Sequence, residues 1–416
     1  MNRLLAEKLY TARDSLDSWL KIKEEESGGI FYSSVDVRDA GFKAAIVDTN
    51  LYPAGFNNIH VNDRFNAATQ TYRLLEECLN APKSILLVIE EHTRNKWYLE
   101  NVVVLKELLS RSGATVTFST AFQVEGETYD GDDSLNLESI SGKALKVYTL
   151  EKALAVAKPD IVILNNDLMK GIPEPLLSEN LKVYPSPKAG WHSRLKSRHF
   201  HFMDSLAAIL AERAGLDPWF ITSLWRRENH VDINIDADRE RLADNAAELL
   251  KSIAEKYKEY EIDSKPFLFL KADYGTYGMG LLPVEDASEI AGMNRKNKNR
   301  LFKGKSARVI DSFILQEGVP TIIRRNEKSA EVCLYQIGSQ TIGSFFRINN
   351  EKNDRENLNS TGMIFEPFEL GKSSEYGICE KQMYMYKTMT RLAGLSARLE
   401  INELQNNVGN EVRISC

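Results

Sequence analysis

The sequence predicts an α/β fold at the N-terminus that changes to an α+β fold in the second half of the chain. Up to residue 185, apolar segments of strand length alternate with helical segments, as in a parallel sheet with crossover helices. The composition changes after Pro185 and Pro187, and from residue 311 onward short apolar segments follow one another closely, which is typical of antiparallel strands. A chain of 416 residues exceeds the usual size of one hydrophobic core, so we expect three regions, at 1–185, 186–314 and 315–416.

The first region begins with an amphipathic helix over residues 1–20. We then expect the strands of the parallel sheet at 44–47, 85–89, 115–118 and 160–164, separated by helices at 72–79, 98–112 and 150–157. Residues 125–141 are rich in Gly, Asp and Ser, which predicts a surface excursion.

The second half of the chain combines long helices with short strands. A helix that runs through Leu210 and a charged helix at 236–260 precede an apolar strand at 267–270 that leads into Lys271. Further strands are expected at 312–316, 331–335 and 341–346. A final helix at 380–392 and a strand at 397–401 complete the prediction.

The composition limits the classes of partner. The chain is 43% hydrophobic and 27% charged, and its net charge of −6 gives no indication of a nucleic-acid or anionic-membrane partner. No apolar run approaches membrane-spanning length, the N-terminus does not resemble a signal peptide, and the four cysteines lack the paired spacing of a zinc site. We therefore expect a cytoplasmic protein with small-molecule partners; the sequence leaves open whether it forms a homo-oligomer.

A lysine followed by glycines marks a candidate phosphate site. Lys271 leads into a loop that contains Gly275, Thr276, Gly278 and Gly280. Glycines let the backbone approach phosphate oxygens, and lysine supplies a mobile positive charge. This is not the P-loop pattern, because the lysine precedes the glycines. Taken alone, the stretch fits an ordinary hairpin turn with a solvated lysine equally well.

The strand at 312–316 ends in a second candidate nucleotide segment. Gln316 closes the strand, and Glu317 and Val319 follow it. Backbone groups and one carboxylate at such a strand end could border an adenine ring. The alternative is a plain strand followed by a turn at Gly318.

Near the C-terminus, Glu400 and Asn402 mark a candidate metal site. They lie two residues apart on the predicted strand, so the carboxylate and the amide would point to the same face. Oxygen ligands of this kind suit Mg²⁺, which needs few of them from protein when phosphates and water complete its shell. A structural hydrogen-bond network is the alternative.

The polar loop at 349–362 and the strand before it carry candidate catalytic residues. Arg347 follows two phenylalanines, and Arg355 and Asn357 lie in the loop. Guanidinium and amide donors suit the anionic oxygens of an acyl-phosphate intermediate. An exposed charged loop is the competing interpretation.

Two strand ends of the first region carry donors that suit an amino-acid substrate. In open α/β sheets the loops beyond the carboxyl ends of the strands form the ligand crevice. Two such loops, together with an arginine before the first strand, could bind an α-carboxylate and an α-amine, and a pair of capped polar turns is the alternative. The candidate substrate-binding residues are Arg38, Asn50, Asn57, Asn58 and Arg94.

A basic run follows the change in composition near residue 187. Lys188, Arg194 and Lys196 could contribute a second lysine to a phosphate site. A lone basic run is more often a solvated surface, so this segment alone decides nothing.

Taken in order, these segments resemble an ATP-grasp ligase. Residues from about 265 to 402 resemble the bacterial glutathione synthetase pattern, through the lysine and glycine loop, Gln316-Glu317, the arginine loop and Leu399-Glu-Ile-Asn402. The full chain is more similar to the proteobacterial glutamate–cysteine ligase family, through the strings Val47-Asp-Thr-Asn-Leu-Tyr-Pro-Ala-Gly-Phe-Asn-Asn58 and Glu91-His-Thr-Arg-Asn95.

The resemblance implies an ATP-grasp fold and ATP-dependent joining of L-glutamate to L-cysteine through a γ-glutamyl phosphate. It implies that Lys271 and the glycine loop hold phosphates, that Gln316 and Val319 border adenine, and that Glu400 and Asn402 hold Mg²⁺. Arg347, Arg355 and Asn357 would steady the intermediate. The chain departs from the family pattern in having no acid at 392–398, where another metal ligand is expected, and Glu331 could substitute. Another ATP-grasp ligase and a non-catalytic nucleotide-binding protein are the alternative functions.

Overall fold

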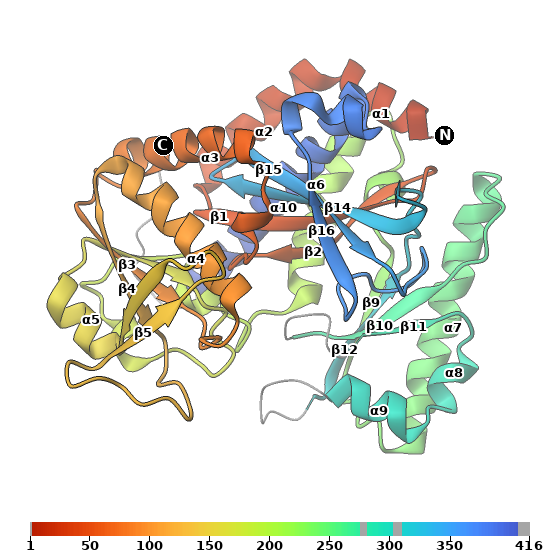
Figure 1. The fold of residues 1–416 in the computed structure, drawn as a ribbon. Helices are drawn as coiled ribbons and strands as arrows, with labels where there is room; N and C mark the ends of the chain where they lie inside the picture. Colours follow the sequence, from red (N-terminus) through yellow and green to blue (C-terminus); the bar gives the residue numbers. More distant parts are fainter. Residues whose placement is uncertain (1, 275–280, 303–309, 407–416) are drawn as a thin grey trace.

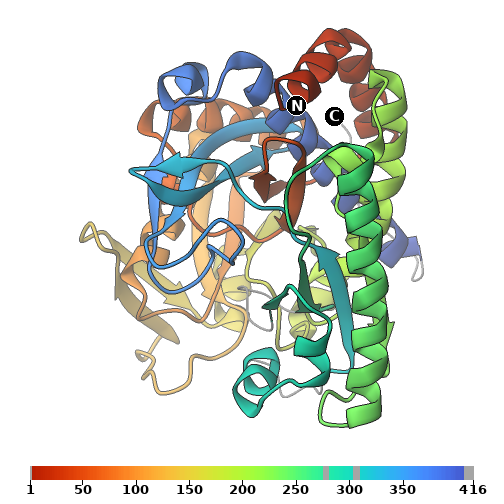
Figure 2. The ribbon, with the colours of Figure 1, turned by 90° about the vertical axis from the view of Figure 1, so that its right-hand side faces the viewer.

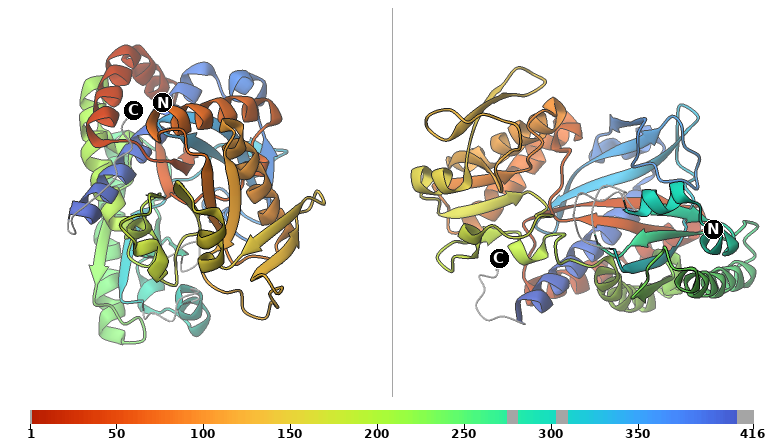
Figure 3. Two further views of the ribbon diagram at one scale, coloured as in Figure 1. Left: turned by 90° about the vertical axis from the view of Figure 1, so that its left-hand side faces the viewer. Right: turned by 90° about the horizontal axis from the view of Figure 1, so that it is seen from below.

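The computed structural model describes residues 2–274, 281–302 and 310–406. In these residues the strands form three sheets. Figure 1 shows one sheet in the centre of the molecule, a second to its left and a third at its lower right. Seen from below, the second sheet and its helices lie at one end of the molecule and helix α7 lies at the other (Figure 3).

The central sheet is antiparallel and combines strands from both ends of the chain. Its order is β16-β15-β14-β1-β2, and the short strand β13 also pairs with β14. The strands are β1 (Tyr32–Asp39), β2 (Ala44–Asn50), β13 (Arg324–Arg325), β14 (Lys328–Ile337), β15 (Gln340–Asn349) and β16 (Met363–Pro367). Residues about 300 positions apart in sequence therefore pair directly, as Val35 does with Leu334.

Alternation along these strands gives the central sheet one apolar face and one polar face. On β1, Val35 and Val37 point to the apolar side, while Ser34, Asp36 and Arg38 point to the other. The apolar face packs against four helices. They are α1 (Asn2–Thr11), α2 (Arg13–Ser27), α6 (Lys196–Ala214) and α10 (Glu380–Asn406). The polar face is left to form the floor of a ligand site.

The second sheet is parallel except for one edge strand. Its order is β5-β6-β4-β3-β7-β8, and only β5 runs antiparallel to its neighbour. The run 85–89 on β3 is fully buried, because its alternate residues enter two different apolar clusters, one on each face. The elements are α3 (Val61–Arg73), β3 (Ser84–Ile89), α4 (Lys96–Leu109), β4 (Thr115–Thr120), β5 (Ser134–Glu138), β6 (Ala144–Tyr148), α5 (Leu150–Ala157), β7 (Ile161–Asn165) and β8 (Val183–Tyr184).

The third sheet is a small antiparallel sheet in the order β11-β10-β12-β9. Helix α7 runs alongside this sheet (Figure 2) and buries an apolar stripe against the sheet. The stripe includes Leu242, Leu249 and Ile253. The elements are β9 (Trp225–Asn229), α7 (Asp236–Glu259), β10 (Leu268–Ala272), β11 (Leu281–Val284), α8 (Ser288–Ala291), α9 (Arg295–Phe302) and β12 (Ser312–Glu317).

Several sequence predictions are confirmed. The strands expected at 85–89, 115–118 and 160–164 are β3, β4 and β7 of the parallel sheet. The helices expected at 98–112, 150–157 and 236–260 are α4 with its 3₁₀ extension, α5 and α7. The strand before Lys271 and the three strands expected between 312 and 346 are β10, β12, β14 and β15.

Other predictions are wrong. The segment at 44–47 is a strand, but β2 pairs antiparallel with β1 in the central sheet rather than joining the parallel sheet. The excursion predicted at 125–141 is exposed and irregular up to residue 133, but it ends in the edge strand β5. The helix expected at 72–79 is the end of a helical stretch that begins at Val61. The helix expected over 1–20 is two helices, α1 and α2, which meet at Ala12.

The strand predicted at 397–401 is also wrong, because α10 continues unbroken to Asn406. The buried residues Met389, Ala393, Ser396 and Glu400 follow helical spacing, so this stretch has the period of a helix and not of a strand. Gly394 permits the helix to lie close to the central sheet, since a Cβ at this position would be 2.1 Å from Nε2 of Gln336.

The boundaries expected near residues 185 and 314 remain a prediction. The central sheet joins strands from the first and third of the predicted regions, at 32–50 and 324–367. The packed units of the structure are therefore not consecutive stretches of chain.

Candidate active site

A cavity of about 590 Å³ lies where the three sheets meet. The polar face of the central sheet contributes Asp36 and Glu331 to its wall, and the third sheet contributes Lys271 and Gln316. Asp167 and Tyr98 come from segments next to the parallel sheet. The volume lies within the range of ordinary small-molecule sites.

Acidic and amide groups of β1 and β2 stand side by side on the cavity face. Asp36 is paired in register with Asp48, and Ser34 is paired with Asn50. Because side chains two residues apart on a strand point the same way, Asp48 and Asn50 both face the cavity, and both line it.

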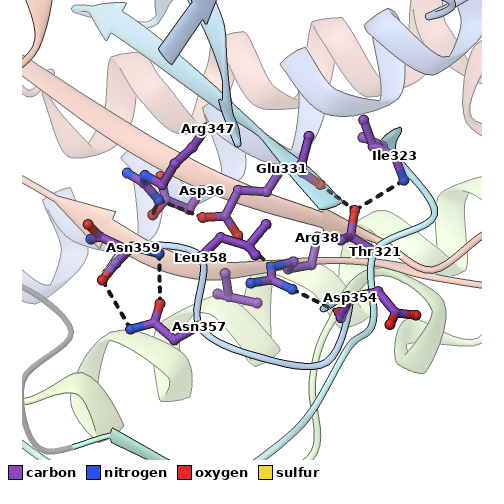
Figure 4. Close-up of polar contacts among 12 residues, drawn as sticks. Asp36, Arg38, Thr321, Ile323, Glu331, Arg347, Asp354, Asn357, Leu358 and Asn359 are labelled. Carbon is purple, nitrogen blue, oxygen red and sulfur yellow. Dashed lines mark hydrogen bonds and ion pairs between the residues drawn. The ribbon is translucent and has the colours of Figure 1, made fainter. Parts of the chain in front are cut away.

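Two arginines share the carboxylate of Glu331 (Figure 4). Arg38 donates from Nε to one oxygen of Glu331, and Arg347 donates from Nη1 to the other at 2.7 Å. Burial favours the neutral form of this carboxyl, but the two guanidinium groups hold the pKa of Glu331 below its usual value. Glu331 is therefore a charged, fixed anchor for both arginines.

Arg38 and Arg347 have different remaining contacts. Arg38 also donates to the carbonyl oxygens of Asp354 and Glu356, at 3.1 and 2.8 Å, so its donors are turned toward the loop that follows β15. Arg347 also donates to Asp36, and its buried Nε has no hydrogen-bond partner among the described residues. A buried guanidinium N–H without a partner is costly, so Arg347 can receive an anionic ligand.

Two lysines of the cavity wall, the buried Lys271 and the partly buried Lys196, lie beside Asp48. Lys271 donates to Oε1 of Gln316 at 2.6 Å, and its Nζ is 3.4 Å from the carbonyl oxygen of Val47. The Nζ of Lys196 lies 4.6 Å from the ring centre of Trp191. Burial lowers the pKa of Lys196 and of Lys271 to about 8, and the charge of Asp48 opposes this shift at both lysines. Two cations with a carboxylate beside them can hold phosphate oxygens.

The predicted nucleotide residues are only partly brought together. Gln316 and Val319 line the cavity, and the buried Nε2 of Gln316 has no partner among the described residues. Glu317 borders the cavity as well, but its carboxylate accepts hydrogen bonds from Lys43 at 2.8 Å, from Trp219 and from the backbone N–H of Leu224. We predicted that the carboxylate of Glu317 borders the adenine, but in the structure these three donors already bind it. Gly275, Thr276, Gly278 and Gly280 lie outside the described residues.

The three predicted catalytic residues separate into two groups. Arg347 and Asn357 line the cavity, and Asn357 exchanges hydrogen bonds with Asn359. Arg355 does not line it, because its guanidinium lies over the ring of Phe267 and donates to the carbonyl oxygen of Lys265. The structure therefore does not bring Arg355 to the site.

Four of the five predicted substrate residues line the cavity. These are Arg38, Asn50, Asn57 and Asn58. Arg94 is the exception, since its side chain is 79% exposed and pairs with Glu127 at 3.1 Å on the outer surface. Arg94 therefore lies in an exposed polar turn, which is closer to the alternative interpretation of that segment.

The predicted metal pair is wrong in its geometry. On helix α10, residues two positions apart point to nearly opposite sides, so Glu400 and Asn402 do not share a face. Glu400 is buried and accepts from Nε of Arg194 at 3.0 Å, and Asn402 donates to the carbonyl oxygen of Ser27 at 3.0 Å. Neither lines the cavity. Within the described ranges, no group of three or more His, Cys, Asp or Glu side chains could hold a metal ion.

Sequence reasoning missed Asp48 and left Lys196 undecided. A signal for Asp48 was present, because Asp48-Thr-Asn50 has the same carboxylate–x–amide spacing as Glu400-Ile-Asn402 and directly follows a predicted strand. Only the structure shows that the first of these two pairs is on a strand and the second on a helix.

A cavity that combines cations, carboxylates and amides in this way has the composition of an enzyme active site for small charged molecules. The chain belongs to the glutamate–cysteine ligase family, whose family model matches residues 6–401. A crystal structure of a Methylobacillus flagellatus KT protein assigned as a gamma-glutamylcysteine synthetase is similar to it, with a TM-score of 0.86 and 29% identity over 96% of each chain. No curated protein matches the chain. In the described part of the chain, no helix is long and apolar enough to cross a membrane.

Proposed function

We propose that this glutamate–cysteine ligase uses ATP to phosphorylate the γ-carboxylate of L-glutamate and that the amine of L-cysteine then attacks the acyl phosphate. In the first step a γ-carboxylate oxygen bonds to the terminal phosphorus and ADP leaves. In the second step the amine nitrogen bonds to the γ-carbon, phosphate leaves, and the nitrogen loses a proton. The products are γ-glutamylcysteine, ADP and phosphate.

The observation that carries the proposal is the meeting of Lys196, Lys271 and Asp48 on one part of the cavity wall. The two lysines come from different elements, α6 and β10, and the carboxylate comes from the central sheet. Phosphoryl transfer needs chiefly positioning and neutralisation of charge from the protein. Lys196 and Lys271 would supply the positive charge, and their burial makes each charge more effective than it would be in water.

The adenine would lie against the third sheet, beside the end of β12. Phe269, Leu281 and Val319 line this part of the cavity with apolar surface. The unpartnered Nε2 of Gln316 offers a hydrogen-bond donor there. This arrangement fits a flat, apolar ring with acceptor nitrogens at its edge.

Asp48 and Asn50 would hold Mg²⁺, and Asp36, which is paired in register with Asp48, is the next carboxylate on the same face of the sheet. The donors fit this ion, because a carboxylate and an amide oxygen on a strand are hard ligands and Mg²⁺ keeps several water or phosphate oxygens in its shell. When bound, the ion would neutralise phosphate charge. In this proposal Asp48 and Asn50 on β2 take the metal-binding role that the sequence analysis gave to Glu400 and Asn402, which have the same spacing.

The γ-carboxyl group of glutamate would lie next to Arg347. Its Nε, which has no hydrogen-bond partner among the described residues, can donate to this carboxylate, while the contacts with Asp36 and Glu331 fix the guanidinium in place. Asn57 and Asn58 can donate to the α-carboxylate of the amino acid, since both line the cavity from the 3₁₀ turn at Phe56–Asn58.

The architecture also fits the proposal of an ATP-grasp fold. In such a fold two α+β lobes hold ATP between them, and here the third sheet and the central sheet would be the two lobes. The parallel sheet would then carry the substrate loops, and residues 32–50 would belong to the second lobe rather than to the N-terminal region.

The test of the proposed function is phosphate release from Mg-ATP with L-glutamate and L-cysteine together and with each alone. We expect release with both, γ-glutamylcysteine by mass spectrometry, and, from glutamate labelled with ¹⁸O in its γ-carboxylate, one ¹⁸O in the phosphate. Product without label transfer would refute the acyl phosphate. Absence of product would refute the activity for this chain.

A further inference from the structure

The cavity face of the central sheet changes in chemistry from one edge of the sheet to the other. Asp48 and Asn50 lie at the β2 edge, and Glu331 and Arg347 lie on β14 and β15. At the β16 edge the cavity is lined by Phe345, Phe365 and Met363, which we call the aromatic edge. The sheet register places Phe365 directly opposite Arg347, so the change from charged to apolar surface is abrupt.

The aromatic edge is too far from the phosphate end to serve the nucleotide. Lys271, which marks the phosphate end, is in contact with the backbone of β2 at Val47. Strand β16 is four strands away from β2, which corresponds to about 19 Å at the usual strand spacing. A glutamate held at Arg347 would lie between these two edges. The substrate that remains for the aromatic edge is the one that supplies the amine.

The aromatic edge consists of several side chains that pack against one another, not of a single exposed ring. The rings of Phe345 and Phe365 meet edge to face with their centroids 5.2 Å apart, and Tyr335 lies 5.4 Å from Phe345. The chain approaches it closely at Gly55, where a Cβ would be 2.8 Å from the hydroxyl oxygen of Tyr335. The φ of +110° at Gly55 also favours glycine, so this close approach depends on that residue.

Phe365 and Met363 line the cavity and yet remain 38% and 39% exposed. They lie two residues apart on β16 and therefore face the same side. Ile364, between them, faces the opposite side and does not line the cavity. Partly exposed apolar side chains at the wall of a cavity gain from being covered by a small apolar ligand group. A sulfur atom is especially suited, because it makes favourable contacts with aromatic rings and with thioethers.

We propose that the aromatic edge, Phe345, Phe365 and Met363, holds the thiol side chain of the amine substrate and selects it against a hydroxyl. This assignment rests on the proposed function and adds to it the part of the cavity that recognises cysteine. The amides of Asn57 and Asn58, which would hold the α-carboxylate of the glutamate, lie at the same end of the cavity.

The test compares Phe365→Ala with the matched control Ile364→Ala on the same strand. We expect Phe365→Ala to raise the KM for L-cysteine by about three- to tenfold and to reduce the preference for L-cysteine over L-serine by a similar factor. The KM values for ATP and L-glutamate should change less than about twofold, and Ile364→Ala should resemble the wild type in all three substrates.

Each outcome decides the assignment. An increase in the KM for ATP or L-glutamate with an unchanged KM for L-cysteine would overturn it. An equal loss in Ile364→Ala would also overturn it, since pairing of the edge strand and not the ring would then be responsible. A wild-type chain that forms no γ-glutamylcysteine would instead refute the proposed function itself, which separates the two failures.

Discussion

At the scale of single residues, burial determines what the charged groups of the site can do. Lys196 and Lys271 lie in the cavity wall, where loss of solvent disfavours their charged forms and lowers their pKa values. The negative charge of Asp48 favours the charged forms and offsets part of this shift. Their pKa values of about 8 place them close to the working range of an enzyme. Both lysines are thus charged at neutral pH and lose their charge only slightly above it.

This predicts the pH dependence of ATP capture. The cationic form exists below the pKa, so kcat/KM for ATP at saturating L-glutamate and L-cysteine should fall as the pH rises through about 8. Lys196→Arg keeps the charge without titration, so only Lys271 loses its proton in this range and the decline should become less steep. Lys271→Met should lower kcat/KM for ATP by about 10²-fold or more at pH 7. A profile that stays flat from pH 7 to 9.5 would contradict the role of the lysines.

Glu400 has a structural role that predicts a different phenotype from loss of a metal ligand. Its carboxylate neutralises the buried Arg194, which also donates to the carbonyl oxygen of Thr49 on β2 at 2.9 Å. Removing one partner of a buried ion pair leaves an unpaired charge, so Glu400→Ala should lower the free energy of unfolding by about 3–5 kcal/mol. Urea unfolding measures this, and Glu400→Gln, which preserves shape, should lose less. Unchanged stability with abolished turnover would restore the metal assignment.

At the scale of elements, one buried ion pair joins the central sheet to the nucleotide end of β12. Lys43, in the turn between β1 and β2, donates to Glu317 at 2.8 Å, and its Nζ lies 4.0 Å from the ring centre of Trp219. Both side chains of the pair are completely buried. The pair therefore fixes the position of Gln316, the neighbour of Glu317, relative to β2.

We predict that Lys43→Met destabilises the protein by about 3–5 kcal/mol, because the carboxylate of Glu317 is left buried without a counter-charge. It should also raise the KM for ATP, since the end of β12 is no longer held. The double variant Lys43→Met, Glu317→Gln should recover most of the lost stability, which a double-mutant cycle measures. Additive losses in the cycle would show that the pair does not couple the two elements.

The same scale shows what the sequence could predict and what it could not. Elements whose pattern is local and strongly periodic, such as α7 and the continuously apolar β3, are predicted correctly in type and place. The stretch 397–401 is short and apolar and could be assigned to a strand or to the end of a helix; its true period appears only when the buried Met389 and Ala393 are counted with Glu400. The incorrect metal pair followed directly from this one assignment.

At the scale of the whole molecule, the pairing of β1 with β14 is the feature that sequence reasoning could not supply. Nothing local in residues 32–39 indicates a partner about 300 positions further on, because register is determined by the burial of one sheet face. Without that pairing, Asp36 and Arg38 cannot be placed beside Glu331 and Arg347. Residue types at the site were therefore largely predictable, whereas their grouping into one cavity depended on tertiary structure.

The central claim is that the metal and phosphates are held at β2, where Asp48 lines the cavity, and not at Glu400, whose carboxylate is bound by Arg194. The most direct test is the rate of γ-glutamylcysteine formation by the wild type and by Asp48→Ala as Mg²⁺ is varied. We predict that the wild type forms the product, and that Asp48→Ala remains folded but needs at least about tenfold more Mg²⁺ for half its maximal rate, or is inactive. A folded Asp48→Ala with the Mg²⁺ dependence of the wild type would contradict the account.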